Sequence, residues 1–228
     1  MLNKLLQFGL ENGYFEILEI RNIEKSCCKH SVTSVIDFDA TKRKIVDAFC
    51  NGTFHIQEPK SCDALKILPE INRLDFIEFK GVSRVIADLS SRSKVNQGVI
   101  QKRIEKFDFR AKITDSLWVL QTLLQSTAFQ MTKSERTEFL NTEKNYFILV
   151  DVEIEDNPIQ NLALTMEFLS VTSSITSITN WVLESIQNEI GEFDNSMVNV
   201  NKPKLISGKF VDAYYQSLLP EGSIDMLL

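Results

Sequence analysis

Histidine, glycine and proline are scarce in this chain, with 2, 8 and 5 residues among 228. So few histidines give little support to a hydrolase built on a histidine base, and the sequence has neither a glycine-rich phosphate loop nor a dinucleotide-binding fingerprint. An apolar fraction of 43% and a charged fraction of 25% are typical of a globular protein with a proper core. We therefore expect one domain over residues 1–228 and set aside kinase, dehydrogenase and ATPase activities.

Long apolar runs are also absent. No stretch approaches the ~18 uninterrupted apolar residues of a membrane span. The N-terminal segment is interrupted by Gln7, Glu11 and Asn12, unlike the apolar core of a secretory signal. We therefore expect a cytoplasmic protein with no membrane partner.

The net charge of -6 argues against a protein that coats nucleic acid over its whole surface, but it is compatible with a local basic groove.

Cysteine is infrequent, and no C-x-x-C pair occurs. Because the chain has no export signal, we expect reduced thiols. A zinc site that adds His30 and His55 to the cysteines is an alternative, although adjacent cysteines reach one tetrahedral metal with difficulty. The four cysteines are Cys27, Cys28, Cys50 and Cys62.

The first half of the chain changes its apolar period. Residues 1–35 have no sustained period, but the alternation over residues 14–20 suits a strand, so we expect an N-terminal strand and its connections. From Asp39, as the N-cap, an apolar stripe predicts a helix that stops at Gly52. Period-two alternation then predicts strands at residues 54–56, 64–68 and 76–79, the last two forming an antiparallel hairpin.

The second half predicts longer elements. Apolar residues at helical spacing predict a helix over about residues 98–126, and an apolar run over residues 146–152 predicts a strand buried on both faces. A second helical region over about residues 158–190 and a strand or short helix over residues 204–219 follow. The fold class we predict is α/β (α+β), with a mixed sheet flanked by helices.

Polar side chains on the two strands of the predicted hairpin need a reason. Because residues i and i+2 of a strand share a face, Glu78 and Lys80 point to one side, and Asp63 lies across from Glu78 near the end of the other strand. Buried carboxylates are costly unless a metal or a partner charge compensates. One Asp and one Glu suffice for Mg²⁺, and a nearby ammonium can orient water or stabilise a phosphodiester transition state.

This pattern resembles the PD-(D/E)XK nuclease superfamily, whose signature is an Asp followed later by Asp/Glu-x-Lys and whose restriction-endonuclease-like core is α-β-β-β-α-β. The resemblance is to poorly characterised bacterial members and covers about residues 36–152, leaving 153–228 as a C-terminal helical and strand extension. The segments that carry it are Cys62-Asp63-Ala64-Leu65, Phe76-Ile77-Glu78-Phe79-Lys80, Lys112-Ile113-Thr114-Asp115-Ser116-Leu117 and Tyr146-Phe147-Ile148-Leu149-Val150.

The resemblance implies a metal-dependent nuclease, a hydrolase of phosphodiester bonds in nucleic acid. Asp63 and Glu78 would be ligands of Mg²⁺ or Mn²⁺ together with the carbonyl of Phe79, and Lys80 would be the catalytic lysine. The partner is then nucleic acid, with DNA expected ahead of RNA.

The chain departs from the family pattern at two places. Cys62 takes the place of the usual proline before the Asp. Many members also carry a Glu on the first helix, whereas this chain has no Glu between Glu24 and Glu58. Asp39 or Asp47 would have to substitute.

Residues 102–112 contain five positive and two negative side chains, a local charge of +3. One interpretation is a face that contacts the phosphate backbone near the active site. The other is a solvated helix face with ion pairs between successive turns. The five basic residues are Lys102, Arg103, Lys106, Arg110 and Lys112.

Other interpretations stay open at the level of sequence. Asp63, Glu78 and Lys80 fit a polar sheet edge with a cross-strand ion pair. The fold also fits a catalytically inactive component of a bacterial multi-protein defence or mobile-element system, with a protein partner or a homodimer. A helical interaction protein built around residues 158–190 is a weaker alternative.

Overall fold

The structure, a computed structural model, describes residues 1–50, 58–92, 95–154, 174–191, 193 and 200–218. Its strands are β1 (Ile17–Glu19), β2 (Ser34–Asp37), β3 (Ala64–Leu68), β4 (Arg73–Lys80), β5 (Glu143–Val150) and β6 (Lys204–Ser207). Its helices are α1 (Leu2–Glu11), α2 (Phe38–Phe49), α3 (Val82–Ser90), α4 (Gln97–Glu105), α5 (Phe109–Gln125), α6 (Lys133–Asn141), α8 (Ser174–Gly191) and α9 (Val211–Leu218).

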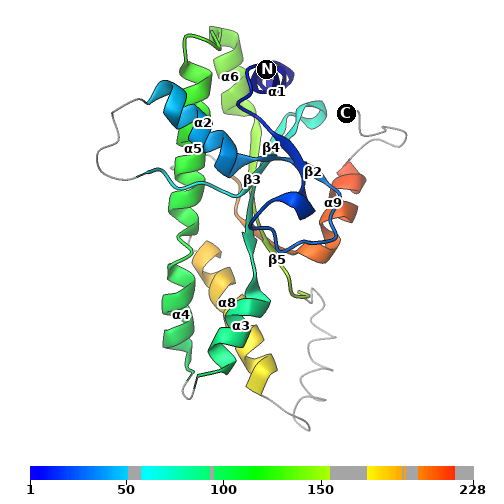
Figure 1. Ribbon diagram of the computed structural model, residues 1–228, viewed down its shortest axis with the longest axis vertical. Coiled ribbons are helices and arrows are strands. Elements are labelled where there is room, and N and C mark those ends of the chain that lie inside the picture. The colour runs from blue at the N-terminus through cyan, green and yellow to red at the C-terminus, as the bar shows by residue number, and fades with distance from the viewer. Residues whose placement is uncertain (51–57, 93–94, 155–173, 192, 194–199, 219–228) are drawn as a thin grey trace.

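The six strands form one mixed sheet in the order β1-β2-β3-β4-β5-β6 (Figure 1). The first four pair antiparallel with their neighbours, whereas β4, β5 and β6 run parallel to one another. A parallel pair needs a long crossover connection. Here α3, α4, α5 and α6 provide it between β4 and β5. The predicted class, a mixed sheet flanked by helices, is confirmed.

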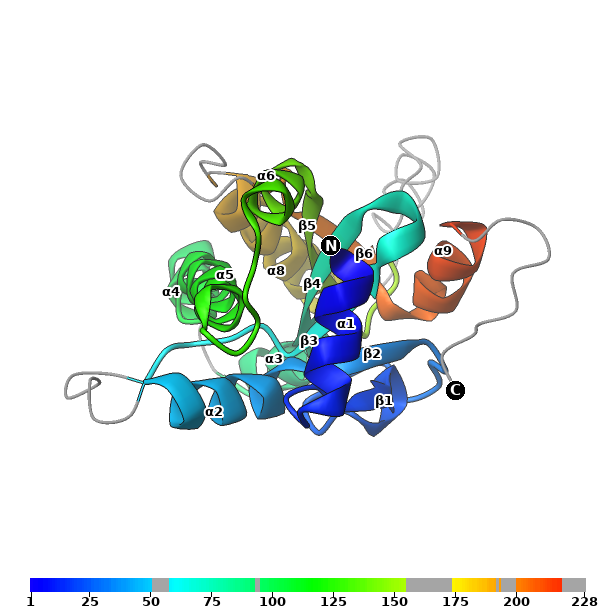
Figure 2. The ribbon, with the colours of Figure 1, turned by 90° about the horizontal axis from the view of Figure 1, so that it is seen from above.

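Helices cover both faces of the sheet. On one face, Phe76 of β4 and Ile148 of β5 belong to the larger apolar cluster, which includes residues of α2, α5 and α8. On the other face, Ile77 and Phe147 pack in a second cluster with Val211 of α9. Figure 2 shows α5 and α9 on opposite sides of the sheet. Because successive side chains of a strand point to opposite faces, the apolar residues of each strand pack in two separate cores, one on each face of the sheet.

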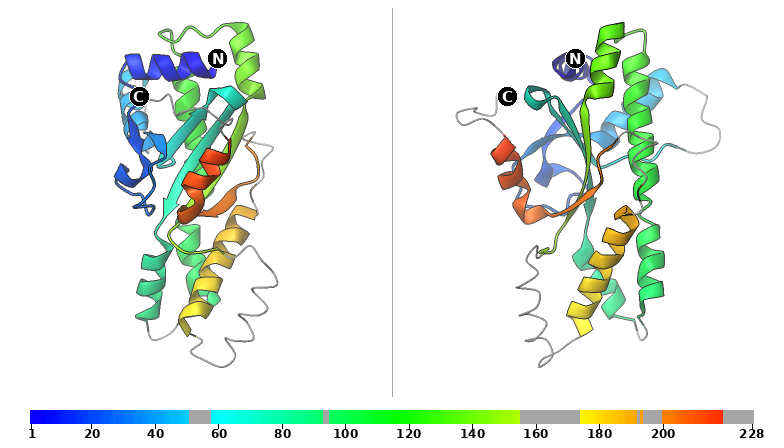
Figure 3. Two further views of the ribbon diagram at one scale, coloured as in Figure 1. Left: turned by 90° about the vertical axis from the view of Figure 1, so that its right-hand side faces the viewer. Right: turned by 180° about the vertical axis from the view of Figure 1, so that it is seen from behind.

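Beyond the C-terminal end of β4, the chain turns directly into α3, and both α3 and α4 contact α8 (Figure 3). These helices extend the larger core past the end of the sheet. The C-terminal ends of β4 and β5 thus lie against helices.

The predicted hairpin is confirmed. Ala64 of β3 pairs with Ile77 of β4, and Leu68 pairs with Arg73. Asn72, with a φ of 48°, supplies the left-handed residue that closes the turn. The strand predicted over residues 146–152 to be buried on both faces is also confirmed as β5, which begins three residues earlier and ends at Val150, with residues 144–150 all buried.

The N-terminal segment differs from its prediction. The alternation near residue 17 does form β1, but α1 precedes it and β2 follows at residues 34–37. Only Leu2, Leu5 and Gly9 of α1 are buried. A ten-residue helix with only three buried residues has too short an apolar repeat to be recognised in the sequence.

The first core helix begins two residues earlier than predicted. Asp37, not Asp39, is the N-cap of α2, and its carboxylate accepts a hydrogen bond of 2.9 Å from the Ala40 N–H. Asp39 lies in the first turn. The predicted end at Gly52 and the predicted strand at residues 54–56 lie outside the described residues. The antiparallel neighbour of β3 on the side away from β4 is β2, which precedes α2.

The predicted helix over residues 98–126 is two helices, α4 and α5. Asp108 between them has a φ of 52°, in the left-handed region that ends a right-handed helix. Sequence periodicity does not detect this break because apolar residues continue at helical spacing on both sides of it.

The C-terminal predictions are confirmed where the chain is described. The second helical region contains α8, while residues 158–173 lie outside the described ranges. The tail contains both a strand and a helix, β6 and α9. Within the ranges that the structure describes, no helix combines the length and the apolar character needed to cross a membrane.

Asp212 attaches α9 to the loop before β2. Its carboxylate accepts hydrogen bonds from the hydroxyls of Ser31 and Thr33, both at 2.6 Å, and from the backbone N–H groups of Val32 and Thr33. Burial opposes ionisation, but these donors hold the pKa of Asp212 below its usual value. The ionised form therefore stabilises the packing of α9.

Asp212→Ala is expected to lower the free energy of unfolding by about 2 kcal/mol, because it removes several hydrogen bonds to a charged acceptor. Chemical denaturation at pH 7 measures the change. Glu153→Ala, which removes only an exposed ion pair with Lys209, is the control and should match the wild type. Equal stability of Asp212→Ala and the control would contradict the assignment.

Candidate active site

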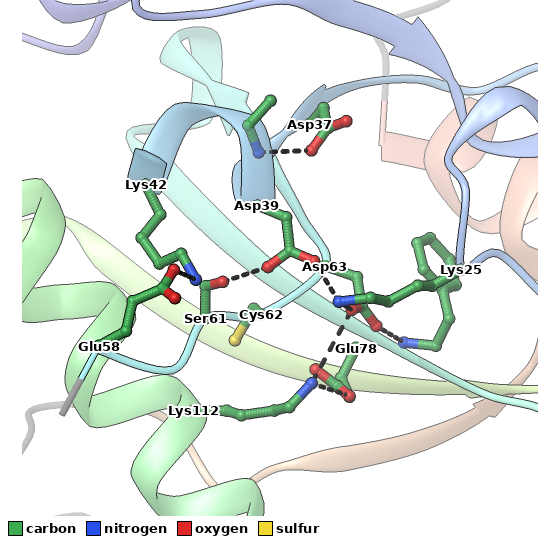
Figure 4. A network of polar contacts seen from close by, with 12 residues as sticks. Lys25, Asp37, Asp39, Lys42, Glu58, Ser61, Cys62, Asp63, Glu78 and Lys112 are labelled. Carbon is green, nitrogen blue, oxygen red and sulfur yellow. Dashed lines mark hydrogen bonds and ion pairs between the residues drawn. The ribbon is translucent and has the colours of Figure 1, made fainter. Parts of the chain in front are cut away.

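The hairpin of β3 and β4 places two carboxylates side by side on one face of the sheet (Figure 4). Asp63 directly precedes β3, and its Oδ2 accepts a hydrogen bond of 2.8 Å from the N–H of Phe79. Glu78, adjacent to Phe79, is 0% exposed, and Asp63 is 2% exposed. The predicted facing arrangement is confirmed, because Phe79 packs in the smaller core while Glu78 points to the opposite face, toward α5.

Helix α5 holds the segment that leads into Asp63. The hydroxyl of Ser116 accepts a hydrogen bond of 2.8 Å from the N–H of Cys62. One residue earlier on the helix, Asp115 accepts a hydrogen bond of 2.8 Å from the N–H of Lys60. Residues 112–117, which carried part of the sequence resemblance, thus position Asp63 through its backbone.

Three lysines from different parts of the chain surround the two carboxylates. Lys80 donates a hydrogen bond to Oε1 of Glu78. Lys112 of α5 reaches the same oxygen at 2.6 Å, and its Nζ lies 3.8 Å from Oδ1 of Asp63. Lys25 approaches that Oδ1 from the other side, also at 3.8 Å. The strand position and the Asp/Glu-x-Lys pattern single out Lys80 in the sequence, and Lys112 is expected only as a basic residue facing nucleic acid. Nothing in the sequence around Lys25 signals its role.

Asp39 is the third acidic residue at this site. Lys25 forms an ion pair with Asp39 as well as with Asp63, and the hydroxyl of Ser61 donates to Asp39. Burial would raise the pKa of Asp39, but these two donors hold it below its usual value. Of the two candidates on the first helix, Asp39 lies beside Asp63, whereas Asp47 is exposed farther along α2.

A cleft of about 350 Å³ leads from the surface to Asp63. Its walls are almost entirely charged. Lys25 lies on one side, and α2 supplies Asp39 and Lys42 on the other (Figure 4). Arg43 of α2 also lines the cleft. The carboxylate of Asp63 is therefore approached through a polar channel.

Burial dominates the electrostatics of Glu78. It raises the pKa of this carboxyl to about 7, the negative charge of Asp63 adds to the effect, and Lys80 and Lys112 oppose it. Burial would lower the pKa of Lys112, but Glu78 and Asp63 together raise it above its usual value. Burial and the nearby charges of Glu78 and Asp63 also raise the pKa of the Cys62 thiol.

Each carboxylate keeps one buried oxygen without a hydrogen-bond partner among the described residues, Oδ1 of Asp63 and Oε2 of Glu78. Such oxygens are costly to bury, and hard cations prefer this kind of ligand. The donor set therefore fits Mg²⁺ or Mn²⁺. Two carboxylates suffice for Mg²⁺, although no group of three or more His, Cys, Asp or Glu residues suited to a metal occurs within the described part of the chain.

The same finding bears on the zinc alternative. The four cysteines are free thiols, and the Sγ atoms of Cys27 and Cys28 lie 3.8 Å apart. No metal-binding group that includes them was found in the described ranges, and His55 lies outside those ranges.

The five basic residues between positions 102 and 112 have different environments on the two sides of the helix break at Asp108. The side chain of Lys112 turns into the site, and Arg103 pairs with Asp88 of α3 at 3.1 Å. At the break itself, the ammonium of Lys80 lies 4.8 Å from the ring centre of Phe107 and 5.8 Å from that of Phe109. The other three basic residues are exposed: Lys102, Lys106 and Arg110.

Comparison of the chain with protein-family models, with curated proteins and with solved structures found no match. The case for a function therefore rests on the geometry and chemistry of this site.

The raised pKa of Glu78 predicts a pH-dependent stability in metal-free buffer. The unfolded chain loses this proton near pH 4.5 and the folded chain near pH 7, so the contribution of Glu78 to stability falls as pH rises through that window. The expected loss is about 3 kcal/mol, since one pKa unit corresponds to about 1.4 kcal/mol.

Urea unfolding of wild type and Glu78→Gln between pH 4.5 and 8 measures this effect. The glutamine variant should gain stability relative to wild type as pH rises, because its side chain stays neutral. Glu153→Gln, at an exposed position, should follow the wild-type profile. Parallel profiles for Glu78→Gln and wild type would contradict the assignment.

Proposed function

We propose that this protein is a metal-dependent nuclease that hydrolyses phosphodiester bonds in nucleic acid, with DNA as the favoured substrate. The observation that carries the proposal is the convergence of two buried carboxylates, Asp63 and Glu78, beside the ammonium of Lys80. Each of these carboxylates has an oxygen that finds no hydrogen-bond partner in the described part of the chain. Apolar strands rarely carry such a group without a chemical reason.

Asp63 and Glu78 would hold Mg²⁺ or Mn²⁺, with the carbonyl of Phe79 as a further ligand. Asp39 would take the part of the acidic residue on the first helix, since Lys25 joins it to Asp63. When bound, the cation supplies positive charge to the phosphodiester and makes a water more acidic.

Lys80 would act on the reacting groups directly. Its ammonium is held by Glu78 and by the faces of Phe107 and Phe109, and its side chain is 14% exposed. A fixed ammonium of this kind donates hydrogen bonds to an attacking water or to a phosphoryl oxygen that gains charge in the transition state. Arg43 at the cleft wall would attract the phosphate backbone, and Lys42 beside it is paired with Glu58 at 2.8 Å.

A second candidate function follows from the same lysines. Lys80 and Lys112 both pair with Glu78, and Lys25 and Lys112 both approach Asp63, so the carboxylates are compensated without a metal. This favours the alternative of a nuclease-fold protein without catalysis, acting within a bacterial multi-protein system. Glu78→Ala would then leave the biological activity intact.

Purified protein is expected to cleave nucleic acid in the presence of Mg²⁺ or Mn²⁺, and the test compares single- and double-stranded DNA and RNA. Lys80→Ala and Asp63→Asn should each lower the cleavage rate by about 100-fold or more, the size of effect seen when one transition-state donor is removed.

Lys209→Ala is the matched control, since it removes a lysine whose ion pair is exposed on the surface, and it should cleave like wild type. Circular dichroism and thermal unfolding verify that each variant is folded. Absence of cleavage by wild type on all four substrates, or equal cleavage by Lys80→Ala, would reject the nuclease.

A further inference from the structure

The carboxylates and ammonium groups of the site balance in number. Asp39, Asp63 and Glu78 contribute three negative charges, and Lys25, Lys80 and Lys112 contribute three positive charges, all joined by the ion pairs described above. With all three carboxyl groups ionised, the site is therefore electrically neutral before any cation enters. A divalent cation would add two charges to a balanced cluster.

Lys112 has a distinct place in this cluster. Lys80 pairs with Glu78, and Lys25 pairs with Asp39 and Asp63, but Lys112 lies between Glu78 and Asp63 and approaches both. Its side chain is only 18% exposed, against 57% for Lys25. Of the two lysines that approach two carboxylates, Lys112 is thus the less exposed to water.

Lys112 forms a hydrogen bond with only one of the two carboxylates that it approaches. Lys112 makes a hydrogen bond of 2.6 Å to Glu78, but it stays at 3.8 Å from Oδ1 of Asp63, beyond hydrogen-bond distance. That Oδ1 and Oε2 of Glu78 have no hydrogen-bond partner within the described residues. Lys112 therefore offsets part of the charge of the pair and leaves one oxygen of each carboxylate without a hydrogen bond from the described residues.

We propose that Lys112 is the resident counter-ion of Asp63 and Glu78 and competes with a divalent cation for them, so that its ammonium leaves when the cation binds. This inference rests on the metal site of the proposed function. Lys112 lies between the same two carboxylates that would hold the cation, whereas Lys80 pairs with Glu78 alone. The ammonium of Lys112 and the cation would therefore compete for one position, because two positive charges within a few ångströms repel each other at a buried site.

Isothermal titration calorimetry of the full chain with MnCl₂ at pH 8 tests the competition. Lys112→Met should bind Mn²⁺ at least about tenfold more tightly than wild type, because the competing charge is gone. Lys112→Arg keeps the charge and should stay close to wild type. Lys102→Met removes an equal charge from an exposed position on α4 and controls for long-range electrostatics.

A second measurement uses the wild-type chain alone. Acetylation of lysines by a water-soluble reagent, followed by mass spectrometry, should label Lys112 several-fold faster with saturating Mn²⁺ than without it. Labelling of Lys102 should not change. This measurement remains valid if a variant at position 112 fails to fold.

The outcomes separate the two proposals. Tighter binding by Lys112→Met and faster labelling of Lys112 support the competition, as does Mn²⁺ binding seen only in Lys112→Met. Equal or weaker binding by Lys112→Met, or unchanged labelling of Lys112 while wild type binds Mn²⁺, overturns the competition and leaves the metal site in place. Absence of Mn²⁺ binding by wild type and every variant overturns both.

Discussion

Two carboxylates inside an apolar sheet must be neutralised where they lie, and much of this structure serves that constraint. Asp63 and Glu78 are almost completely buried, so any compensating charge has to come from elements packed against them. Helix α5 supplies Lys112, the segment after β1 supplies Lys25, and β4 itself supplies Lys80. The first turn of α2 adds Asp39 and completes the balance.

The fold around the site follows from the same need. Helix α5 approaches the hairpin closely enough for Ser116 to accept a hydrogen bond from the Cys62 backbone. The left-handed turn at Asp108 ends α4 and sets Phe107 and Phe109 under the ammonium of Lys80. A continuous helix over residues 98–126 would not place those two rings in this way. The helix break is therefore part of the site.

Sequence alone predicts the parts that depend on neighbours along the chain. The hairpin, the shared face of Glu78 and Lys80, and the buried strand β5 follow from period-two alternation. The site beyond Lys80 depends on residues far apart in sequence. Lys25 and Asp39 meet Asp63 only through tertiary packing, and a lysine at position 112 looks the same in sequence whether it faces solvent or a buried carboxylate. Short elements such as α1 are not predicted from sequence for another reason: three buried residues are too few to define a helical period.

The parallel pairing of β4 with β5 also bears on the order in which the site assembles during folding. Asp63 and Glu78 belong to a hairpin with a short turn, so they meet through local contacts. Lys112 lies within the crossover between β4 and β5, and it arrives only when that long connection closes over the sheet. Closing a long loop costs more entropy and time than forming a hairpin. By this reasoning Asp63, Glu78 and Lys80 come together through local contacts, and Lys112 completes the charge balance only when α5 docks.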